Sequence, residues 1–332
     1  MTNFDSKEPI KLTHKIDIPL DVWEENISEY IENYNAITKG TGKLFIFAGD
    51  QKIEHLNNDF KGEGISIEDS NPEHLFKIAK YGKIGAFATQ FGLLCRYGRD
   101  YPSIDYIVKL NSKTNLVESC QKDPLSTLLI DISDVIEFKK RTGLNIRGVG
   151  YTLYLGSEFE SEMLSKAGRI IHEAHKNGLI AVIWIYPRGK AVRNEKEPKI
   201  IAGATGVGAC IGADFVKVNY PQSKEPEIDF KDAIASAGRT KVICAGGSSK
   251  KPEKFLKILS EQINISGASG CATGRNIHQK SLLDAVALTY AINEIVYNNN
   301  TIDDALEFLK PELKEKIRDE ILLKQYESEK IK

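Results

Sequence analysis

A lysine in the middle of an apolar stretch is the residue of this sequence with the clearest chemical potential. Residues 212–220 are Gly-Ala-Asp-Phe-Val-Lys-Val-Asn-Tyr, followed by Pro221, a pattern that predicts a short buried strand carrying Lys217. A buried lysine is costly unless it is paired with an acid or uncharged. An uncharged amine attacks carbonyl carbons. The pattern therefore predicts either a structural ion pair or a nucleophile that forms a Schiff base.

Other reactive side chains lie at the ends of predicted strands. Asp50 follows an apolar stretch near the N-terminus, and Trp184, Tyr186 and Arg188 alternate along another, so these three share one face. An acid and a phenol beside a lysine can move protons around a carbonyl group. Packing requires none of these groups at strand ends, which favours the catalytic interpretation of Lys217 over the ion pair.

Two glycine-rich turns predict a phosphate site. Each follows a predicted strand, where backbone N–H groups can point at an anion, where glycine lets the backbone approach closely, and where a serine or an arginine adds donors and charge. Two ordinary connections between strand and helix are the alternative. The residues are Gly246, Gly247 and Ser248 in the first turn, and Gly274 and Arg275 in the second.

Eight apolar stretches, most of them separated by segments with helical spacing, organise these residues. The separations are long enough for parallel crossovers, which predicts a (β/α)8 TIM barrel whose strands end at the face carrying the reactive groups. An open doubly wound sheet is the rival architecture. The predicted strands span 43–49, 84–90, 106–111, 148–154, 179–186, 212–220, 241–245 and 268–273.

Helical segments flank the predicted barrel, which spans residues 43–297. Residues 1–40 are expected to form an extension on the outside of the barrel, and residues 301–328 a C-terminal helix that decorates it or contacts another copy. Together these parts predict one domain, 1–332. Two histidines at helical spacing, His172 and His175, are expected to be exposed rather than metal-bound.

The composition excludes several classes of protein. With 41% hydrophobic and 27% charged residues and a net charge of −1, the chain is ordinary for a soluble protein and lacks the basic excess of nucleic-acid or membrane-surface binders. Five cysteines, none spaced Cys-x-x-Cys, predict a reduced cytoplasmic protein without disulfides or a zinc site. The first residues lack a signal-peptide pattern, and no apolar run is long enough to span a membrane.

Five segments of the predicted barrel are specific enough to compare with a known family. They are Tyr-Thr-Leu-Tyr-Leu-Gly-Ser (151–157), Trp-Ile-Tyr-Pro-Arg-Gly (184–189), Gly-Ala-Asp-Phe-Val-Lys-Val (212–218), Ala-Gly-Gly-Ser (245–248) and Thr-Gly-Arg-Asn (273–276). With them the sequence resembles the archaeal-type class I fructose-1,6-bisphosphate aldolases of the DhnA-related branch. The resemblance covers residues 43–297.

The resemblance implies an aldehyde-lyase of glycolysis and gluconeogenesis that uses a Schiff base. It implies Lys217 as the Schiff-base lysine, Tyr186 as the general acid/base, and Asp50 as the aspartate of the first strand. Trp184 and Arg188 would frame the site, and the two turns would hold a substrate phosphate. It further implies phosphorylated ketose and triose substrates, no metal or other cofactor, and a pentamer-based homo-oligomer, with a decamer among its forms.

The sequence departs from that family at its first strand and leaves other functions open. Shorter relatives have Asp-His-Gly where this chain has Asp50-Gln51-Lys52, followed by Glu54-His55, and the region 91–130 is expanded. The aldehyde substrate therefore stays open. The alternatives are a related lysine aldolase, such as an aminodideoxyheptulosonate synthase or a transaldolase-like enzyme, a sugar-phosphate isomerase, and a non-catalytic sugar-phosphate binder.

Overall fold

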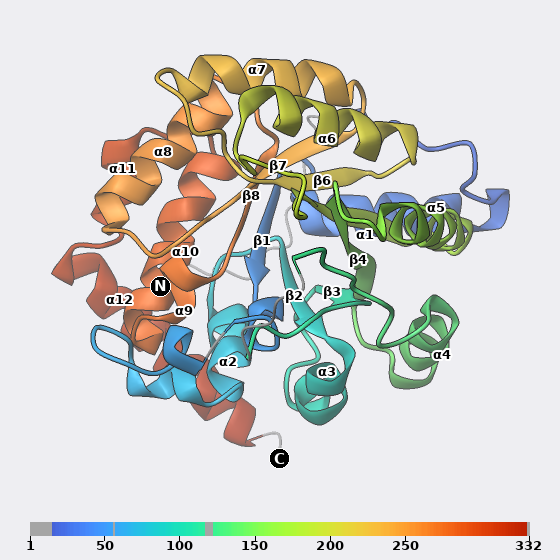
Figure 1. Cartoon of the computed structure of the whole chain (residues 1–332). Coiled ribbons are helices and arrows are strands. Elements are labelled where there is room, and N and C mark those ends of the chain that lie inside the picture. The colour runs from blue at the N-terminus through green and yellow to red at the C-terminus, as the bar shows by residue number, and fades with distance from the viewer. Residues whose placement is uncertain (1–14, 56, 117–121, 331–332) are drawn as a thin grey trace.

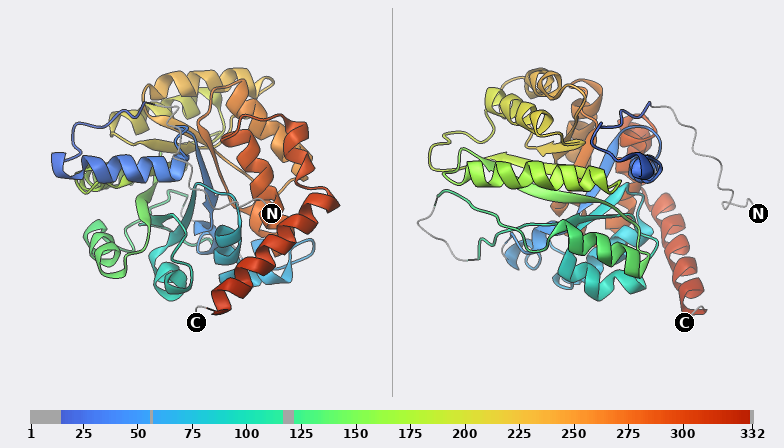
Figure 2. Two further views of the ribbon diagram at one scale, coloured as in Figure 1. Left: turned by 180° about the vertical axis from the view of Figure 1, so that it is seen from behind. Right: turned by 90° about the vertical axis from the view of Figure 1, so that its right-hand side faces the viewer.

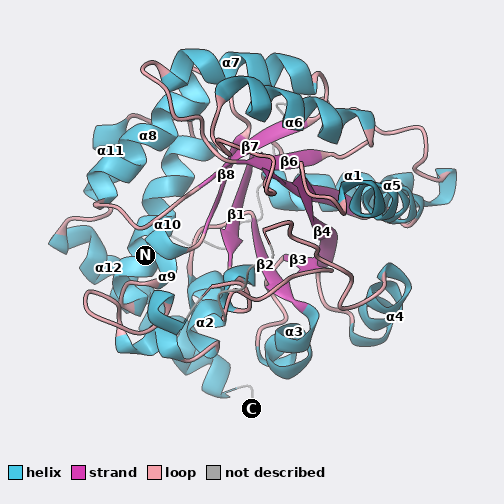
Figure 3. Cartoon of the chain, viewed as in Figure 1, coloured by secondary structure: helices cyan, strands magenta, loops and turns pink. Residues whose placement is uncertain are grey.

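The computed structural model describes residues 15–55, 57–116 and 122–330, and within them eight parallel strands close into a barrel in chain order (Figures 1 and 3). Every neighbouring pair is parallel, and β8 pairs with β1. The predicted (β/α)8 fold is confirmed, and each predicted strand overlaps an observed one. The strands are β1 (Leu44–Ala48), β2 (Ala86–Gln90), β3 (Tyr106–Lys109), β4 (Ile146–Leu155), β5 (Ile180–Pro187), β6 (Phe215–Val218), β7 (Lys241–Ala245) and β8 (Gly270–Thr273).

Helices surround the strands because each carries an apolar stripe that must be buried against the sheet. In α5 (Glu160–Lys176), for example, Met163, Ala167, Ile170 and Ile171 are buried at helical spacing. The other helices are α1 (Ile27–Thr38), α2 (Glu73–Tyr81), α3 (Phe91–Tyr97), α4 (Ile132–Thr142), α6 (Pro198–Cys210), α7 (Pro226–Ala237), α8 (Pro252–Asn264), α9 (Arg275–His278), α10 (Leu282–Val296), α11 (Ile302–Glu307) and α12 (Pro311–Lys330).

The barrel interior changes from apolar to polar along the strands. Side chains near the strand starts form one apolar cluster, in which Ile46, Ile107, Val182 and Phe215 meet. Two residues further along β3 and β6 the same inward face carries Lys109 and Lys217. The barrel therefore presents buried polar groups at the end where its strands finish, which is the functional end of this fold.

The N-terminal segment packs outside the strands, as expected, and covers the end of the barrel opposite the functional end. Val22, Tyr30, Tyr34 and Ile37 belong to the same apolar cluster as the residues at the strand starts, and the ring of Tyr34 stacks on Phe215 with centroids 5.7 Å apart. Helix α1 lies on the near side of the strands in the view from behind (Figure 2, left). The periodicity of this helix showed an apolar face but could not show that an open barrel mouth would receive it.

The predicted C-terminal helix is two helices, α11 and α12. Proline cannot continue a helix because it lacks the N–H donor and its ring clashes with the preceding turn, so it begins a helix instead. Pro311 opens α12 in this way, and the capping box of Thr301 with Asp304 opens α11. Among the described residues, no helix is long and apolar enough to cross a membrane.

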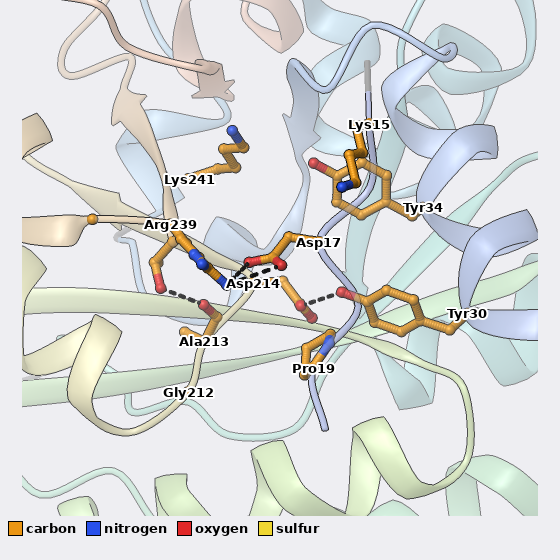
Figure 4. A pocket seen from close by; sticks show the side chains of 12 residues that line it. Lys15, Asp17, Pro19, Tyr30, Tyr34, Gly212, Ala213, Asp214, Arg239 and Lys241 are labelled. Carbon is orange, nitrogen blue, oxygen red and sulfur yellow. Dashed lines mark hydrogen bonds and ion pairs between the residues drawn. The ribbon is translucent and has the colours of Figure 1, made fainter. Parts of the chain in front are cut away.

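A buried charge network joins the N-terminal segment to the start of β6, and the expectation for His175 is wrong. His172 is exposed, whereas His175 is buried, with Nδ1 2.8 Å from Asp21 Oδ1 and Nε2 3.1 Å from Asp214 Oδ2. Asp214 also accepts a hydrogen bond from Tyr30 Oη at 2.5 Å (Figure 4). The backbone N–H of Ala181 donates to the same carboxylate at 2.7 Å. The spacing of the two histidines is visible in the sequence, but the acids that other elements bring to His175 are not.

Burial alone would lower the pKa of His175, but Asp214 and Asp21 outweigh it and raise the pKa to about 9. The ordinary value is about 6.5. A raised folded-state pKa stabilises the protein fully below pH 6.5, and this contribution is lost as pH rises through about 9.

We predict that His175→Gln lowers the free energy of unfolding at pH 6 by about 3–5 kcal/mol, because it leaves Asp214 buried without its charged partner. The difference from wild type should shrink between pH 7 and pH 10, as measured by urea titration followed by circular dichroism. The control, His172→Gln, should change stability by less than about 0.5 kcal/mol because that side chain is exposed. An equal loss at pH 6 and pH 10 would contradict the assignment.

Candidate active site

Lys217 lies on the inner face of β6 at the functional end of the barrel and is 2% exposed. Burial lowers its pKa, against the opposing effects of Asp50 and Glu54. Its Nζ lies 5.4 Å from the ring centre of Trp184, the residue paired with it on β5, and makes no hydrogen bond or ion pair with a described residue. This environment favours a neutral amine, the form that attacks a carbonyl.

Asp50 begins a short 3₁₀ helix, Asp50–Lys52, directly after β1, as the sequence predicted for the end of that strand. Gln90 Nε2 donates to the Asp50 carbonyl oxygen at 2.6 Å and fixes the turn. Burial raises the pKa of the Asp50 carboxyl group, although Lys217 and Lys109 oppose the shift. One of its oxygens, Oδ1, is buried without a hydrogen-bond partner among the described residues.

A second lysine, Lys109, shares the site, and the sequence analysis missed it. It ends β3, is fully buried, and donates from Nζ to Thr152 Oγ1 at 2.6 Å and to the carbonyl oxygen of Asn111 at 3.0 Å. The same Nζ lies 4.0 Å from Asp50 Oδ2. The signal was present, since this lysine also ends an apolar stretch on the inward face of its strand.

Glu54 is the second carboxylate of the site, and its function was also missed. Its Oε1 accepts from Ser112 Oγ at 2.8 Å and lies 3.9 Å from Lys109 Nζ. Its backbone carbonyl accepts from Asn115 Nδ2 at 2.8 Å, so the segments after β1 and β3 hold each other. The segment after β1 therefore places a second carboxylate, in addition to that of Asp50, near Lys109.

Trp184 lies near both lysines, and Gly150 gives its ring room. Its ring centre is 5.3 Å from Lys109 Nζ and 5.4 Å from Lys217 Nζ. A methyl group at Gly150 would lie 2.4 Å from Trp184 Cζ3 and 3.3 Å from Lys109 Cδ, so only glycine fits between these side chains. The indole Nε1 is buried without a hydrogen-bond partner among the described residues, which leaves it free to donate to a ligand.

Tyr186 follows Trp184 on the inner face of β5, as predicted, and burial raises its pKa above the ordinary value. The phenol is therefore its resting form at neutral pH. The ring of Tyr154 lies 6.5 Å away, centre to centre, on β4. Arg188 covers both rings at 5.7 Å and makes a two-bond ion pair with Glu195, at 2.7 and 2.8 Å, which fixes the rim.

The two glycine-rich turns are joined by Asn276, a residue to which the sequence analysis gave no function. Its Nδ2 donates to the carbonyl oxygens of Gly246 and Ser248, and its Oδ1 accepts from the backbone N–H of Lys250. Gly246 and Gly247 line a cavity of about 200 Å³ that Lys196 and Lys250 also line. The predicted turns thus lie together, beside two lysines that had not been considered.

Arg275 begins α9, immediately after Gly274, and is only partly paired. Its Nη1 lies 3.9 Å from Asp59 Oδ1, while its Nε is buried without a hydrogen-bond partner among the described residues. Gly274 itself is required where it stands, because a methyl group there would lie 2.5 Å from the carbonyl oxygen of Ala48. Among the described residues, no group of three or more histidines, cysteines or acids is placed to hold a metal ion.

The fold and the site together define a structural class of protein. It is a (β/α)8 barrel that carries a buried lysine at its functional end, with an acid and a phenol beside the lysine. Residues 44–280 match the DeoC/LacD family of aldolases. The chain is 58% identical over 291 residues, 88% of its length and 93% of the relative, to the fructose-bisphosphate aldolase/6-deoxy-5-ketofructose 1-phosphate synthase of Methanocaldococcus jannaschii.

Two solved structures are similar over most of the chain. The fructose-bisphosphate aldolase of Slackia heliotrinireducens has a TM-score of 0.86 and 53% identity, covering 89% of this chain and 93% of that one. An archaeal fructose-1,6-bisphosphate aldolase, with its catalytic lysine covalently bound to the carbinolamine intermediate, has a TM-score of 0.69 and 32% identity, covering 81% and 99%. The chain belongs to the DeoC/LacD aldolase family, in the branch of the archaeal-type class I fructose-bisphosphate aldolases.

We predict that Gly150→Ala displaces the Trp184 ring, lowers aldolase activity at least about tenfold and destabilises the fold by about 1–3 kcal/mol, as overpacking does. Tryptophan fluorescence, urea titration and steady-state kinetics measure the three effects. Gly168→Ala is the matched control, because a methyl group there meets nothing within 4 Å, and alanine is the better helix former in α5. Wild-type fluorescence and activity in Gly150→Ala would show that the ring does not need this space.

Proposed function

We propose that the protein cleaves fructose 1,6-bisphosphate reversibly to dihydroxyacetone phosphate and glyceraldehyde 3-phosphate through a Schiff base on Lys217. The observation that carries the proposal is Lys217 itself, a buried lysine with a lowered pKa and with no hydrogen bond or ion pair to a described residue, at the functional end of a barrel. The archaeal relative with a covalently bound catalytic lysine supports it.

The covalent step begins when the Lys217 nitrogen attacks the C2 carbonyl of the ketose. The C–N bond forms as the carbonyl electron pair moves to oxygen, which takes up a proton, and the nitrogen loses one to give the carbinolamine. Loss of the C2 oxygen as water then leaves the iminium. We assign the proton transfers of these steps to Asp50, whose raised pKa and unpartnered oxygen suit a group that both accepts and donates.

Bond cleavage follows because the iminium accepts electrons. The C3–C4 bond breaks, its electron pair moves into the iminium to give an enamine, and the C4 hydroxyl proton leaves to Asp50 as the aldehyde forms. A proton then returns to C3, and water hydrolyses the regenerated iminium to free the lysine. We assign the donation to C3 to the Tyr186 phenol, which recovers its proton from the carboxyl group.

Substrate binding is assigned to the rim of the barrel. Trp184 Nε1 and Arg275 Nε are buried donors without described partners, which a substrate hydroxyl and a phosphate would satisfy. We place one phosphate at the turns of Gly246, Gly247, Ser248 and Gly274, where backbone N–H groups and nearby cations gather. Arg188 frames the opposite side.

A second candidate activity is the synthesis of 6-deoxy-5-ketofructose 1-phosphate, which the name of the Methanocaldococcus jannaschii relative includes. Breaking that compound between C3 and C4 gives dihydroxyacetone phosphate and methylglyoxal, so the Lys217 chemistry would be the same and only the aldehyde would differ. The 58% identity and the unusual residues Gln51 and Glu54 after β1 favour it.

We also propose that the chain assembles as a homo-oligomer, pentamer-based as the family resemblance implies, with α12 as one contact. Leu322, Leu323 and Tyr326 are more than half exposed on this helix, as expected of a surface that another copy covers. We also propose that residues 1–332 form one domain, built on the barrel.

We predict that borohydride with dihydroxyacetone phosphate adds one reduced triose phosphate per chain, on the peptide that contains Lys217. Intact-mass and peptide mass spectrometry measure it, and Lys217→Met should show no adduct. Absence of an adduct in the wild type would remove the class I mechanism, and an adduct elsewhere would refute the residue assignment.

Arg275→Ala should lower kcat/KM for fructose 1,6-bisphosphate about tenfold to a hundredfold, because a hydrogen bond to a charged group contributes about 1.5–3 kcal/mol. Slow cleavage of unphosphorylated fructose should be nearly unchanged, since that substrate never made the contact. The ratio of the two kcat/KM values is the measurement. An equal loss for both substrates would make Arg275 structural.

A further inference from the structure

Lys109 has no step in the mechanism above, yet it is fully buried a few ångströms from the groups that do. It is held by acceptors on three segments: Thr152 Oγ1 on β4, the carbonyl oxygen of Asn111 after β3, and the carboxylates of Asp50 and Glu54 after β1. A fully buried lysine with this many acceptors is stabilised as an ammonium.

The two lysines of the site differ in their direct contacts, although burial lowers the pKa of both and Asp50 and Glu54 oppose that shift in both. Lys217 makes no hydrogen bond or ion pair with a described residue, whereas Lys109 has two hydrogen bonds and two carboxylates within 4.0 Å. Both face the same indole ring, so they differ in their acceptors and not in their depth. Pairs of titratable groups with divergent surroundings take different protonation states.

Resting on the proposed Schiff base at Lys217, we propose that Lys109 is a fixed ammonium that balances one of the two negative charges of Asp50 and Glu54 and so keeps Lys217 in its amine form. Lys109 acts through Asp50 and is a positioning residue, not a nucleophile, because its donors are already engaged. It keeps Asp50 ionised and able to accept a proton, without Lys217 supplying the counter-charge.

The charges of the site explain why this residue is needed. With Lys109 charged and Lys217 neutral, two carboxylates face one ammonium. Without Lys109 they face none, so the pair formed by Asp50 and Lys217 takes up a proton more readily. If that proton rests on the amine, Lys217 cannot attack the carbonyl group. If it rests on the carboxyl group, Asp50 cannot accept a proton. The other titratable or charged groups that face this cluster are Cys271 on β8, Arg275 on α9, Tyr186 and Arg188 at the end of β5, Tyr154 on β4 and Lys113 after β3.

The test is the pH dependence of trapping in Lys109→Met, which removes the charge but keeps most of the volume. The rate of adduct formation on Lys217 with dihydroxyacetone phosphate and cyanoborohydride is measured from pH 5.5 to 9.5, using about half-unit steps. We expect the half-maximal rate to move upward by about one to three pH units, and the rate to recover toward wild type at high pH. Lys190→Met is the matched control, because Lys190 is exposed and paired with Asp123 and Glu158 on the surface, so its curve should not move.

Thr152→Val provides a second variant that keeps both lysines and removes only the acceptor 2.6 Å from Lys109. It should move the curve in the same direction by less, and it carries the test if Lys109→Met does not fold. A uniform drop in trapping at all pH values, with an unmoved midpoint, would overturn the inference and leave the Schiff base standing. No trapping in the wild type would instead remove the proposed function, and this inference with it.

Discussion

This structure depends on one constraint: ionisable side chains are buried away from water at one end of a closed barrel. The strands bring Lys109 and Lys217 to the same depth as Asp50, where burial penalises every charged form. Each charge must therefore be matched by acceptors or given up. Thr152 and Asn111 accept hydrogen bonds from Lys109. Lys217 makes no hydrogen bond or ion pair with a described residue.

The rest of the barrel supports the functional end by packing and by hydrogen bonds. The apolar layers at the strand starts, closed from below by Tyr30 and Tyr34 of α1, exclude water beneath the site. The network of Asp214 and His175 holds the beginning of the strand that carries Lys217 only three residues further on. Stability at one end and reactivity at the other are thus parts of one packing arrangement.

The sequence predicted the fold because its signals are local. Apolar stretches of strand length, separated by helical spacing, define each unit, and the order of units defines a barrel. It also predicted that Asp50, Tyr186, Lys217 and Arg275 lie at the functional end, because the ends of parallel strands converge. What it missed is set by contacts between distant segments: the acceptors around Lys109, the reach of Glu54 to Ser112, and the acids that enclose His175.

The comparisons and the site support the same chemistry at different levels of detail. Family membership establishes an aldolase, and the burial that lowers the pKa of Lys217 gives a physical reason why its amine form is favoured. The segment after β1 contributes to the same site, because Glu54 Oε1 lies 3.9 Å from Lys109 Nζ.

The most direct measurement is a neutron crystal structure of the substrate-free protein near pH 7, exchanged into deuterated water, because it locates the protons on both amines. The account predicts two deuterons on Lys217 Nζ, three on Lys109 Nζ and none on Asp50. Three deuterons on Lys217, only two on Lys109, or a deuteron on Asp50 would each contradict it.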